Sequence, residues 1–496
     1  MTQLYYQSTR GNQERVPSAT AILQGIAKDG GLFVPDTVPV LETSLETLQT
    51  LDYRQLAYQI MKLFLTDFTE DELKLCIEQA YDKKFDTPEI APLQKKDGVS
   101  FLELYHGPTL AFKDMALSIL PYLLKMAARK LNMNKEIVIL TATSGDTGKA
   151  ALEGFANVAG TKIIVFFPEH GVSQVQKRQM TTQSGDNTYV IGIEGNFDDA
   201  QSGVKSMFAD QVLLQAMDER GYMFSSANSI NIGRLVPQVV YYFHAYLRLC
   251  ASGEIELGEE INFAVPTGNF GNILAGYYAK KMGLPVKKLI CASNENKVLY
   301  DFFQSGNYNK NRDFVVTMSP SMDILVSSNL ERLLYHVSGE DGSVTGRLME
   351  ELSSSGKYDI PEELKFGLRD FFGGYATEDD TARSIRELFL SSNYLIDTHT
   401  AVAYSVCREY EEVTSDPTKI IVISTASPYK FPADVMKSIE PRFAFADEFA
   451  LLHEMSKLTG HDIPDAIKDI GTRPVLHKTV CETGEMKGQV EKILGI

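Results

Sequence analysis

The stretch His106-Gly107-Pro108-Thr109-Leu110-Ala111-Phe112-Lys113, followed by Asp114, places one lysine where an extended segment gives way to a helix. Apolar residues then recur at helical spacing on one face: Ala116, Leu117, Ile119, Leu120, Leu123 and Leu124. A lysine at such a junction can reach into a cleft instead of lying along a solvated helix. Taken alone it is equally a surface lysine that opens a helix, because lysines are mostly exposed. The composition of the other polar loops of the chain distinguishes a lysine in a binding site from a surface lysine.

The length and composition describe an ordinary globular protein of more than one domain. At 496 residues the chain exceeds what one hydrophobic core comfortably supports, so we expect two or three domains. Its 44% apolar and 23% charged residues are typical of globular proteins. No apolar run approaches the roughly 18 residues that a membrane span needs. Because Met1–Gln7 has neither a basic flank nor a long apolar region, we expect a cytoplasmic protein without a secretory signal.

The charge and the metal-binding residue types narrow the partners. A net charge of −17 argues against nucleic acid or an acidic membrane, although a local cluster of donors can still bind a small anionic substrate. The cysteines number five, an odd count without a CxxC pair, which favours reduced core thiols over disulfides or zinc. His453-Glu454 begins like a zinc-protease motif, but Lys457 stands where the second histidine belongs. We therefore expect no metal, and the sequence does not distinguish a monomer from a homodimer.

Short apolar runs rich in β-branched residues alternate with helical patterns, which predicts an α/β fold with mostly parallel sheets. The runs are Ile137–Leu140, Ile163–Phe167, Tyr189–Ile193, Asn262–Val265, Lys288–Cys291 and Ile420–Ile423. Three of these strands end in polar loops, at Thr141–Gly148, Pro266–Asn272 and Ser424–Lys430. Since ligands of such folds bind beyond the carboxyl ends of the strands, the three loops indicate one shared site.

The helical and strand patterns also suggest where the domains divide. Two helical patterns, around Leu45–Phe64 and Thr69–Tyr81, precede most of the strand signals. We predict two α/β domains and a helix-rich N-terminal domain. The units are an N-terminal domain at 1–95, a small α/β domain at 134–212, a large domain at 96–133 and 213–440 that receives the cofactor and carries an insertion at 300–390, and a closing helical tail at 441–496.

The loop Gly268–Asn272 is suited to a phosphate group. Its glycines let backbone N–H groups approach an anion closely, and the helical pattern Ile273–Lys280 supplies a helix N-terminus. A tight turn without any ligand explains the same residues equally well. The spacing of a dinucleotide fingerprint is absent, and Gly148-Lys149 is followed by Ala150 where a Walker A motif needs Ser or Thr. The sequence therefore lacks the motifs that would best support binding of NAD or ATP.

Two further loops add donors for anions. Ser144-Gly145-Asp146-Thr147 offers donors at a helix N-terminus for a substrate carboxylate and the edge of a cofactor ring, although a plain helix cap has the same composition. Ser226–Arg234 places Arg234, which is planar and permanently charged, where it suits a substrate phosphate; alone it predicts a surface ion pair. A lysine able to form a Schiff base beside a phosphate cradle points to pyridoxal phosphate (PLP). Thr425 could then bond the pyridine nitrogen through a neutral hydroxyl.

The segment Glu103–Asp114 resembles the lysine motif of the threonine synthases, PLP enzymes of the tryptophan-synthase-β-like fold (fold type II). Ser8–Gly11 and Asp29–Pro35 look like the N-terminal domain of the long form of that family, and Met322–Arg332 looks like its inserted region. The resemblance covers nearly the whole chain. It implies a carbon-oxygen lyase for the last step of threonine biosynthesis, which converts O-phospho-L-homoserine and water to L-threonine and phosphate by γ-elimination and addition of water at Cβ.

The resemblance also implies roles for individual residues. Lys113 would be the catalytic lysine that binds PLP, and Thr425 would face the pyridine nitrogen. The other implied contacts are Gly268, Asn269, Phe270, Gly271 and Asn272 with the cofactor phosphate, Ser144, Asp146 and Thr147 with the substrate carboxylate and the ring hydroxyl side, and Ser229, Asn231 and Arg234 with the substrate phosphate. One position departs from the family pattern, because Ser427 stands where many members have histidine.

Three alternatives stay open from the residues alone. Another PLP lyase of the same fold, such as a serine/threonine dehydratase or an O-acetylserine sulfhydrylase (cysteine synthase), would use the same lysine but needs no second phosphate site. A sensor that binds a phosphorylated ligand without turnover would keep the fold, although retention of Lys113 disfavours it. A nucleotide-binding protein is the third alternative, and its loops lack the required spacing.

Overall fold

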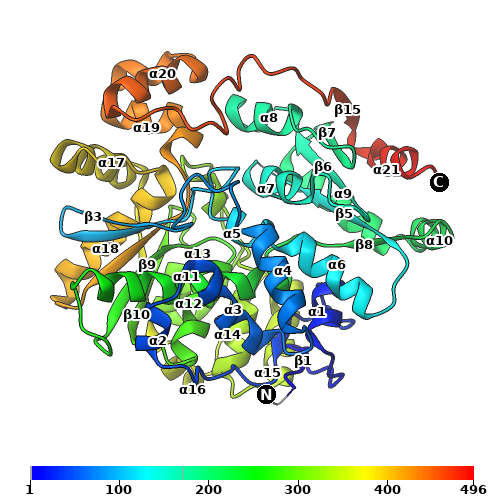
Figure 1. Ribbon diagram of the computed structural model, residues 1–496, viewed down its shortest axis with the longest axis horizontal. Coiled ribbons are helices and arrows are strands. Elements are labelled where there is room, and N and C mark those ends of the chain that lie inside the picture. Colours follow the sequence, from blue (N-terminus) through cyan, green and yellow to red (C-terminus); the bar gives the residue numbers. More distant parts are fainter. Residues whose placement is uncertain (1–2, 144, 171) are drawn as a thin grey trace.

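The computed structural model describes residues 3–143, 145–170 and 172–496, and it contains two separate parallel sheets (Figure 1). The larger sheet has six strands in the order β13-β10-β9-β14-β4-β3, and the smaller has five in the order β15-β7-β6-β5-β8. Every neighbouring pair is parallel except β3 and β4. The predicted α/β class with mostly parallel sheets is therefore confirmed.

The strands have the following bounds. The larger sheet consists of β3 (Leu93–Lys96), β4 (Val99–Glu103), β9 (Ile261–Pro266), β10 (Val286–Ser293), β13 (Phe371–Tyr375) and β14 (Ile420–Ser424). The smaller sheet consists of β5 (Glu136–Ala142), β6 (Thr161–Pro168), β7 (Thr188–Glu194), β8 (Tyr222–Ser225) and β15 (Thr479–Glu482). Two antiparallel ribbons complete the set: β1 (Tyr6–Ser8) with β2 (Phe33–Pro35), and β11 (Asn307–Asn309) with β12 (Lys357–Asp359).

Helices account for most of the remaining chain. Those before β9 are α1 (Ser18–Gln24), α2 (Leu45–Gln49), α3 (Tyr53–Phe64), α4 (Glu70–Ala80), α5 (Asp114–Leu117), α6 (Leu120–Lys130), α7 (Asp146–Phe155), α8 (Gln174–Thr181), α9 (Phe197–Ala209), α10 (Gln211–Glu219) and α11 (Ile232–Ala251). Those after β9 are α12 (Gly271–Lys281), α13 (Val298–Ser305), α14 (Leu330–Val337), α15 (Gly342–Ser355), α16 (Glu362–Lys365), α17 (Glu378–Ser392), α18 (Thr398–Thr414), α19 (Pro432–Ile439), α20 (Glu448–Thr459) and α21 (Met486–Leu494).

Each strand predicted from a β-branched run lies inside an observed strand. The strands that the sequence did not predict have less typical compositions. Strand β4 carries Ser100 and Glu103, and β13 reads Phe-Phe-Gly-Gly-Tyr, whose glycines weaken the strand signal. Strand β13 falls within the predicted insertion at 300–390, yet it pairs with β10 and forms one edge of the larger sheet. Pairing with a neighbouring strand, not local propensity, makes these segments extended.

The helical pattern over Leu45–Phe64 is divided into α2 and α3. The break comes at Asp52, whose carboxylate accepts a hydrogen bond from the backbone N–H of Gln55 (2.8 Å) while the Gln55 side chain accepts from the Asp52 backbone N–H. This reciprocal cap starts a new helix where the apolar periodicity alone would continue the old one.

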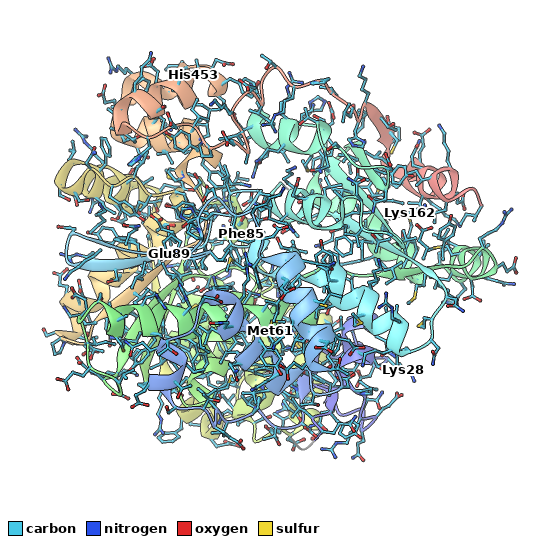
Figure 2. The ribbon with its side chains drawn as sticks, viewed as in Figure 1. Lys28, Met61, Phe85, Glu89, Lys162 and His453 are labelled. Atoms are coloured by element: carbon cyan, nitrogen blue, oxygen red, sulfur yellow. The ribbon has the colours of Figure 1, made fainter. Side chains whose placement is uncertain are left out.

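The N-terminal segment shares a hydrophobic core with the larger part of the molecule. The Tyr6 hydroxyl donates to the backbone carbonyl of Phe64 (2.9 Å), and the Phe64 ring stacks on Tyr278 of α12 with centroids 6.1 Å apart. Met61 of α3 is fully buried among the packed side chains (Figure 2). Helix α11, at the centre of this core, is buried on nearly all sides. The division at residue 95 is thus not a division of the core.

The chain after residue 440 crosses from one part of the molecule to the other (Figure 1). After α19 and α20 it runs to β15, which pairs in parallel with β7 at the edge of the smaller sheet. The tail is therefore not purely helical. Strand β8 also joins the smaller sheet, although it lies beyond the predicted end of the small domain at residue 212. The domain boundaries at 212 and 440 stay predictions.

The cysteines stay unpaired in the described part of the chain, and the expectation of no metal stays a prediction. All five cysteines are free, and all but Cys250 are buried. Among the described residues no group of three or more His, Cys, Asp or Glu side chains could hold a metal ion. His453 lies on α20 at the outer edge of the molecule (Figure 2). No described helix combines the length and the apolar character that a membrane crossing requires.

Replacing Phe64 with Ala should destabilise the whole molecule, because its ring is fully buried where the N-terminal helices meet α12. We expect a loss of about 3–5 kcal/mol in the free energy of unfolding, measured as a shift of the urea midpoint. Phe445→Ala is the control, because Phe445 is 100% exposed. A separate early transition confined to residues before 95 would contradict the shared core.

Candidate active site

The loop that carries Lys113 is folded around the carboxylate of Asp114. That carboxylate accepts hydrogen bonds from the backbone N–H (2.8 Å) and the hydroxyl (2.6 Å) of Thr109. Gly107 packs so closely on it that a Cβ at this position would lie 2.6 Å from the Asp114 Cβ. Leu110 adopts a positive φ of 60°. The turn therefore needs its small and polar residues, and it delivers Lys113 to the first residue before α5.

His106, at the start of the same loop, joins it to the neighbouring segments. Its Nδ1 lies 2.6 Å from Asp86 Oδ1 and its Nε2 lies 2.9 Å from Glu103 Oε2. Burial opposes the imidazolium charge, but hydrogen bonds to Asp86 and Glu103 raise the pKa of His106 to about 9. The histidine is therefore charged at neutral pH and holds the entry to the lysine loop.

The loop after β14 is joined to the lysine loop by backbone hydrogen bonds. The N–H of Phe112 donates to the carbonyl of Thr425 (2.7 Å), and the N–H of Ser427 donates to the carbonyl of Leu110 (3.0 Å). Thr425 and Lys113 are thus brought together. The Ser427 hydroxyl accepts from the backbone N–H of Tyr429 (3.3 Å), so at the position where many family members have histidine this chain has a cap for the turn at Pro428–Lys430.

The Lys113 amine lies between two oxygens in a nearly closed space. Its Nζ donates to Ser321 Oγ at 3.1 Å and stands 3.6 Å from Asp146 Oδ2. The side chain is only 11% exposed, and burial is the main cause that lowers the pKa of Lys113. A lysine amine held this way loses its proton more readily than one in water.

Asp146, the first residue of α7, is the carboxylate of this site. Its Oδ1 accepts from Lys430 Nζ (2.9 Å) and from Gln176 Nε2 (3.1 Å), and its Oδ2 accepts from Ser321 Oγ (3.3 Å). Burial opposes ionisation, but the amines of Lys430 and Lys113 hold the pKa of Asp146 well below its usual range. An ionised carboxylate repels another, so this geometry favours the ring hydroxyl side of a cofactor over the substrate carboxylate as its neighbour.

Other residues of the loop between β5 and α7 stabilise the start of α7. The Thr143 hydroxyl accepts from the N–H groups of Gly145 (3.0 Å) and Gly148 (2.9 Å), and Gly145 has a φ of 146° that favours glycine. Thr147 follows Asp146 in the first turn and is partly exposed. Ser144, a predicted substrate contact, lies outside the described residues.

The loop between β9 and α12 is packed against the segment 321–329. A Cβ at Gly268 would lie 2.6 Å from the carbonyl oxygen of Ser321. The Ser327 hydroxyl donates to the carbonyl of Gly268 (2.6 Å), and the Asn329 amide donates to the carbonyl of Asn269 (2.9 Å). Phe270 adopts a left-handed φ of 61° just before the helix begins. These contacts fix the shape of the loop just before the N-terminus of α12.

Asn272 carries a donor that lacks a partner. Its Oδ1 accepts from the hydroxyls of Tyr241 (2.9 Å) and Tyr242 (2.7 Å), which fixes the orientation of the amide. Its Nδ2 is buried and has no hydrogen-bond partner among the described residues. Leaving a buried donor unsatisfied is costly, so this atom favours an anionic ligand at the start of α12.

Arg234 is a buried cation without a carboxylate partner in the described part of the chain. Its Nη1 donates to the carbonyl of Ala227 (3.0 Å), whereas its Nε has no partner there. Burial lowers the pKa of Arg234 to about 10, and it remains charged at neutral pH. Ser229, in the loop before it, has its Cβ 4.0 Å from where a Cβ of Gly271 would stand. The two anion-binding loops therefore meet.

The predicted phosphate contact Asn231 is engaged elsewhere. Its Nδ2 donates to the carbonyls of Ile22 (2.9 Å) and Ser226 (3.1 Å), and its Oδ1 accepts from the N–H of Gly233 (2.9 Å). The fully buried side chain caps α11 and ties it to α1. It supports the loop that carries Arg234, and a direct bond to a ligand would require giving up one of these contacts.

Sequence reasoning missed several residues that line this site. Ser321, Gln176 and Lys430 contact Asp146 or Lys113, and His399 fixes Ser321. The Nε2 of His399 accepts from the backbone N–H of Ser321 (3.1 Å), so its Nδ1 carries the proton and donates to Asp397 Oδ2 (2.8 Å). Only Lys430 stood in a loop that had been singled out. The others have no motif, and only the folded chain brings them together.

Comparisons with known proteins show which family this chain is similar to. Family models match as "Threonine synthase N terminus" over residues 5–81, "Pyridoxal-phosphate dependent enzyme" over 87–426 and "Threonine synthase, C-terminal" over 400–472. Threonine synthase of Pseudomonas aeruginosa is 42% identical over 439 residues, which is 87% of this chain and 90% of that protein.

Solved structures give the same result. The PLP-bound threonine synthase of Brucella melitensis superposes with a TM-score of 0.88 at 36% identity, covering 99% of this chain and 98% of its own. Threonine synthase from yeast superposes with a TM-score of 0.88 at 32% identity, covering 99% of both chains.

His106→Gln tests the charged clamp of the lysine loop. Because the pKa of His106 is raised from 6.5 to about 9, its ionic stabilisation is complete below pH 6.5 and is lost as the pH rises through 9. The difference in unfolding free energy between the native chain and the variant should therefore shrink by roughly 1–2 kcal/mol between pH 6 and pH 10. A difference that is constant with pH, measured by urea unfolding, would refute the charge assignment.

Proposed function

This chain belongs to the threonine synthase family of PLP-dependent enzymes, and we propose that it converts O-phospho-L-homoserine and water to L-threonine and phosphate. It is a PLP-dependent lyase of threonine synthesis. The observation that carries the proposal is the convergence of the buried Lys113 amine with two donors that lack partners among the described residues, Asn272 Nδ2 and Arg234 Nε.

The residues present suit PLP. Lys113 supplies a buried amine, and the unpartnered amide of Asn272 at the N-terminus of α12 suits the cofactor phosphate. Gly268, Asn269, Phe270 and Gly271 would offer backbone donors beside it, and Thr425 would face the pyridine nitrogen with a neutral hydroxyl. When bound, PLP withdraws electrons from the substrate and makes the hydrogens at Cα and Cβ acidic.

Lys113 is the base that we propose for the proton transfers. Its lowered pKa leaves a larger neutral fraction near neutral pH, which a general base requires. It would take the proton from Cα and then one from Cβ, and phosphate would leave Cγ with its bonding electrons. A proton is then placed on Cγ, the hydroxyl of water adds to Cβ and Cα regains a proton, which gives threonine.

Arg234 would stabilise the phosphate as it leaves. The guanidinium is already dehydrated and, among the described residues, has no carboxylate to compete for it, so it interacts strongly with a developing anion. Ser229 would bind the same phosphate, while Asn231 would hold the loop. Thr147, in the first turn of α7, would bind the substrate carboxylate, and Ser144, which lies outside the described residues, is proposed as a second contact.

The second anion site favours a phosphorylated substrate over the alternatives. A serine/threonine dehydratase or an O-acetylserine sulfhydrylase has no use for a buried Arg234 next to the cofactor phosphate site. We also propose a cytoplasmic location, which the free thiols support. Fractionation of cells that express the tagged chain would test it.

Lys113→Ala should abolish the formation of threonine and phosphate, because no other amine of the site is free to replace it. Coupled assays for phosphate and threonine from O-phosphohomoserine measure the loss, which we expect to be at least about 10⁴-fold. Lys125→Ala, an exposed lysine of α6, is the control and should retain full activity. Substantial turnover by the Lys113 variant would refute the assignment.

Arg234→Ala should raise KM for O-phosphohomoserine by about 100-fold, equivalent to a lost charge-assisted contact of about 2.7 kcal/mol, and leave PLP affinity nearly unchanged. Arg248→Ala, at the other end of α11, is the control. Steady-state kinetics and PLP titration give both values. Equal losses in the two affinities would mean that Arg234 holds the cofactor phosphate and not that of the substrate.

A further inference from the structure

Lys430 is a fully buried lysine that stands beside the site and has no assigned role. Its side chain is 0% exposed, and its Nζ lies 2.9 Å from Asp146 Oδ1 and 2.8 Å from the carbonyl oxygen of Thr109. It stands at the end of the short turn Pro428–Lys430 that follows β14. Burying an ammonium group away from water is costly, so this amine depends on its two oxygen partners for stabilisation.

The partner carboxylate comes from the other sheet. Asp146 begins α7, which connects β5 and β6 of the smaller sheet, whereas Lys430 and Thr109 lie next to strands of the larger sheet. The two oxygens of Asp146 are divided between two amines: Oδ1 contacts Lys430, and Oδ2 faces Lys113. The carboxylate is therefore positioned from the larger sheet by a cation that does not react.

If Asp146 had Lys113 as its sole cationic partner, the two would form an ion pair that keeps the Lys113 amine protonated. With Lys430 on Oδ1, part of that negative charge is already compensated, and Lys113 also feels the repulsion of a second cation. The other titratable groups that face these side chains are Arg234 of α11, Asp114 of α5 and His399 of α18. His399 accepts a hydrogen bond from the backbone N–H of Ser321 through its Nε2.

We propose that Lys430 is a positioning residue: its ammonium keeps Asp146 ionised and directed at Lys113, while leaving the Lys113 amine able to give up its proton. The proposal rests on the function proposed above, in which Lys113 is the base. The Lys430 Nζ contacts Asp146 Oδ1 and the carbonyl oxygen of Thr109, and it acts on Lys113 through Asp146.

Lys430→Met tests this role in the full-length chain freed of PLP. Competitive acylation of lysines over a range of pH, followed by peptide mapping, gives the reactivity of the Lys113 amine without any substrate. Without Lys430, Asp146 pairs with Lys113 alone, so the titration of Lys113 should move to higher pH by about one unit, a tenfold lower reactivity on the acid side. In the PLP-loaded enzyme the acid limb of kcat/KM should move in the same direction.

A second variant separates this role from a merely structural one. Asp146→Asn removes the carboxylate and leaves the repulsion between the two amines, so the Lys113 titration should move to lower pH, opposite to Lys430→Met. Lys149→Met removes another lysine–carboxylate pair of α7, the partly buried pair with Glu153, and should not move the Lys113 titration. Lys430→Arg, which keeps the charge, should restore the native profile.

The outcomes are distinct. Opposite shifts in the Lys430 and Asp146 variants support the proposal. An unchanged profile in folded Lys430→Met, or shifts of the same sign in both variants, would overturn it. If Lys430→Met does not fold, as judged by circular dichroism, Lys430→Gln replaces it, since the amide keeps a donor for Thr109 but not the charge. Because the labelling needs no turnover, its result does not depend on whether the proposed reaction is correct.

Discussion

The buried carboxylate of Asp146, held between two lysine amines where the two sheets meet, is the interaction on which the site depends. Breaking one partner of such a buried pair typically costs about 3–5 kcal/mol, because the remaining charge is left unpaired. The carboxylate is ionised because Lys430 and Lys113 flank it. Asp146 begins α7 and contacts Lys113 and Lys430, so it joins a helix of the smaller sheet to two loops that follow strands of the larger sheet.

Around that pair the site carries more cations than anions. Lys430 and Arg234 are buried and Lys113 is largely buried, whereas Asp146 is the one carboxylate that contacts any of them among the described residues. A chain of net charge −17 thus keeps a locally positive interior. The excess is what two phosphate groups, one on the cofactor and one on the substrate, would neutralise. We propose that those groups bind at the unpartnered atoms of Asn272 and Arg234.

Much of this arrangement could be predicted from the sequence, because parallel α/β folds gather ligands at strand exits. The runs before Thr141, Pro266 and Ser424 are β-branched and short, so their strands and the loops after them were found. Lys113, Asn272 and Arg234 then follow from loop chemistry. Family resemblance, not periodicity, supplied the substrate.

What could not be predicted depends on contacts between distant segments. Ser321 belongs to no motif, and the composition of the loop that contains Lys430 does not show that this lysine contacts Asp146. Ser321 and Lys430 reach Lys113 and Asp146 only after the chain has folded. Strand β13 has two glycines and becomes extended because β10 lies beside it. Asn231 has a side chain that could bind an anion, but its amide caps α11 and bonds to α1 instead.

The most direct measurement is to reduce the PLP-loaded chain with borohydride, digest it and map the labelled lysine by mass spectrometry. The predicted result is a single phosphopyridoxyl label on Lys113. A label on Lys430 or on a lysine outside the site, with Lys113 unmodified, would contradict the central claim that the amine at position 113 is the one that joins the cofactor.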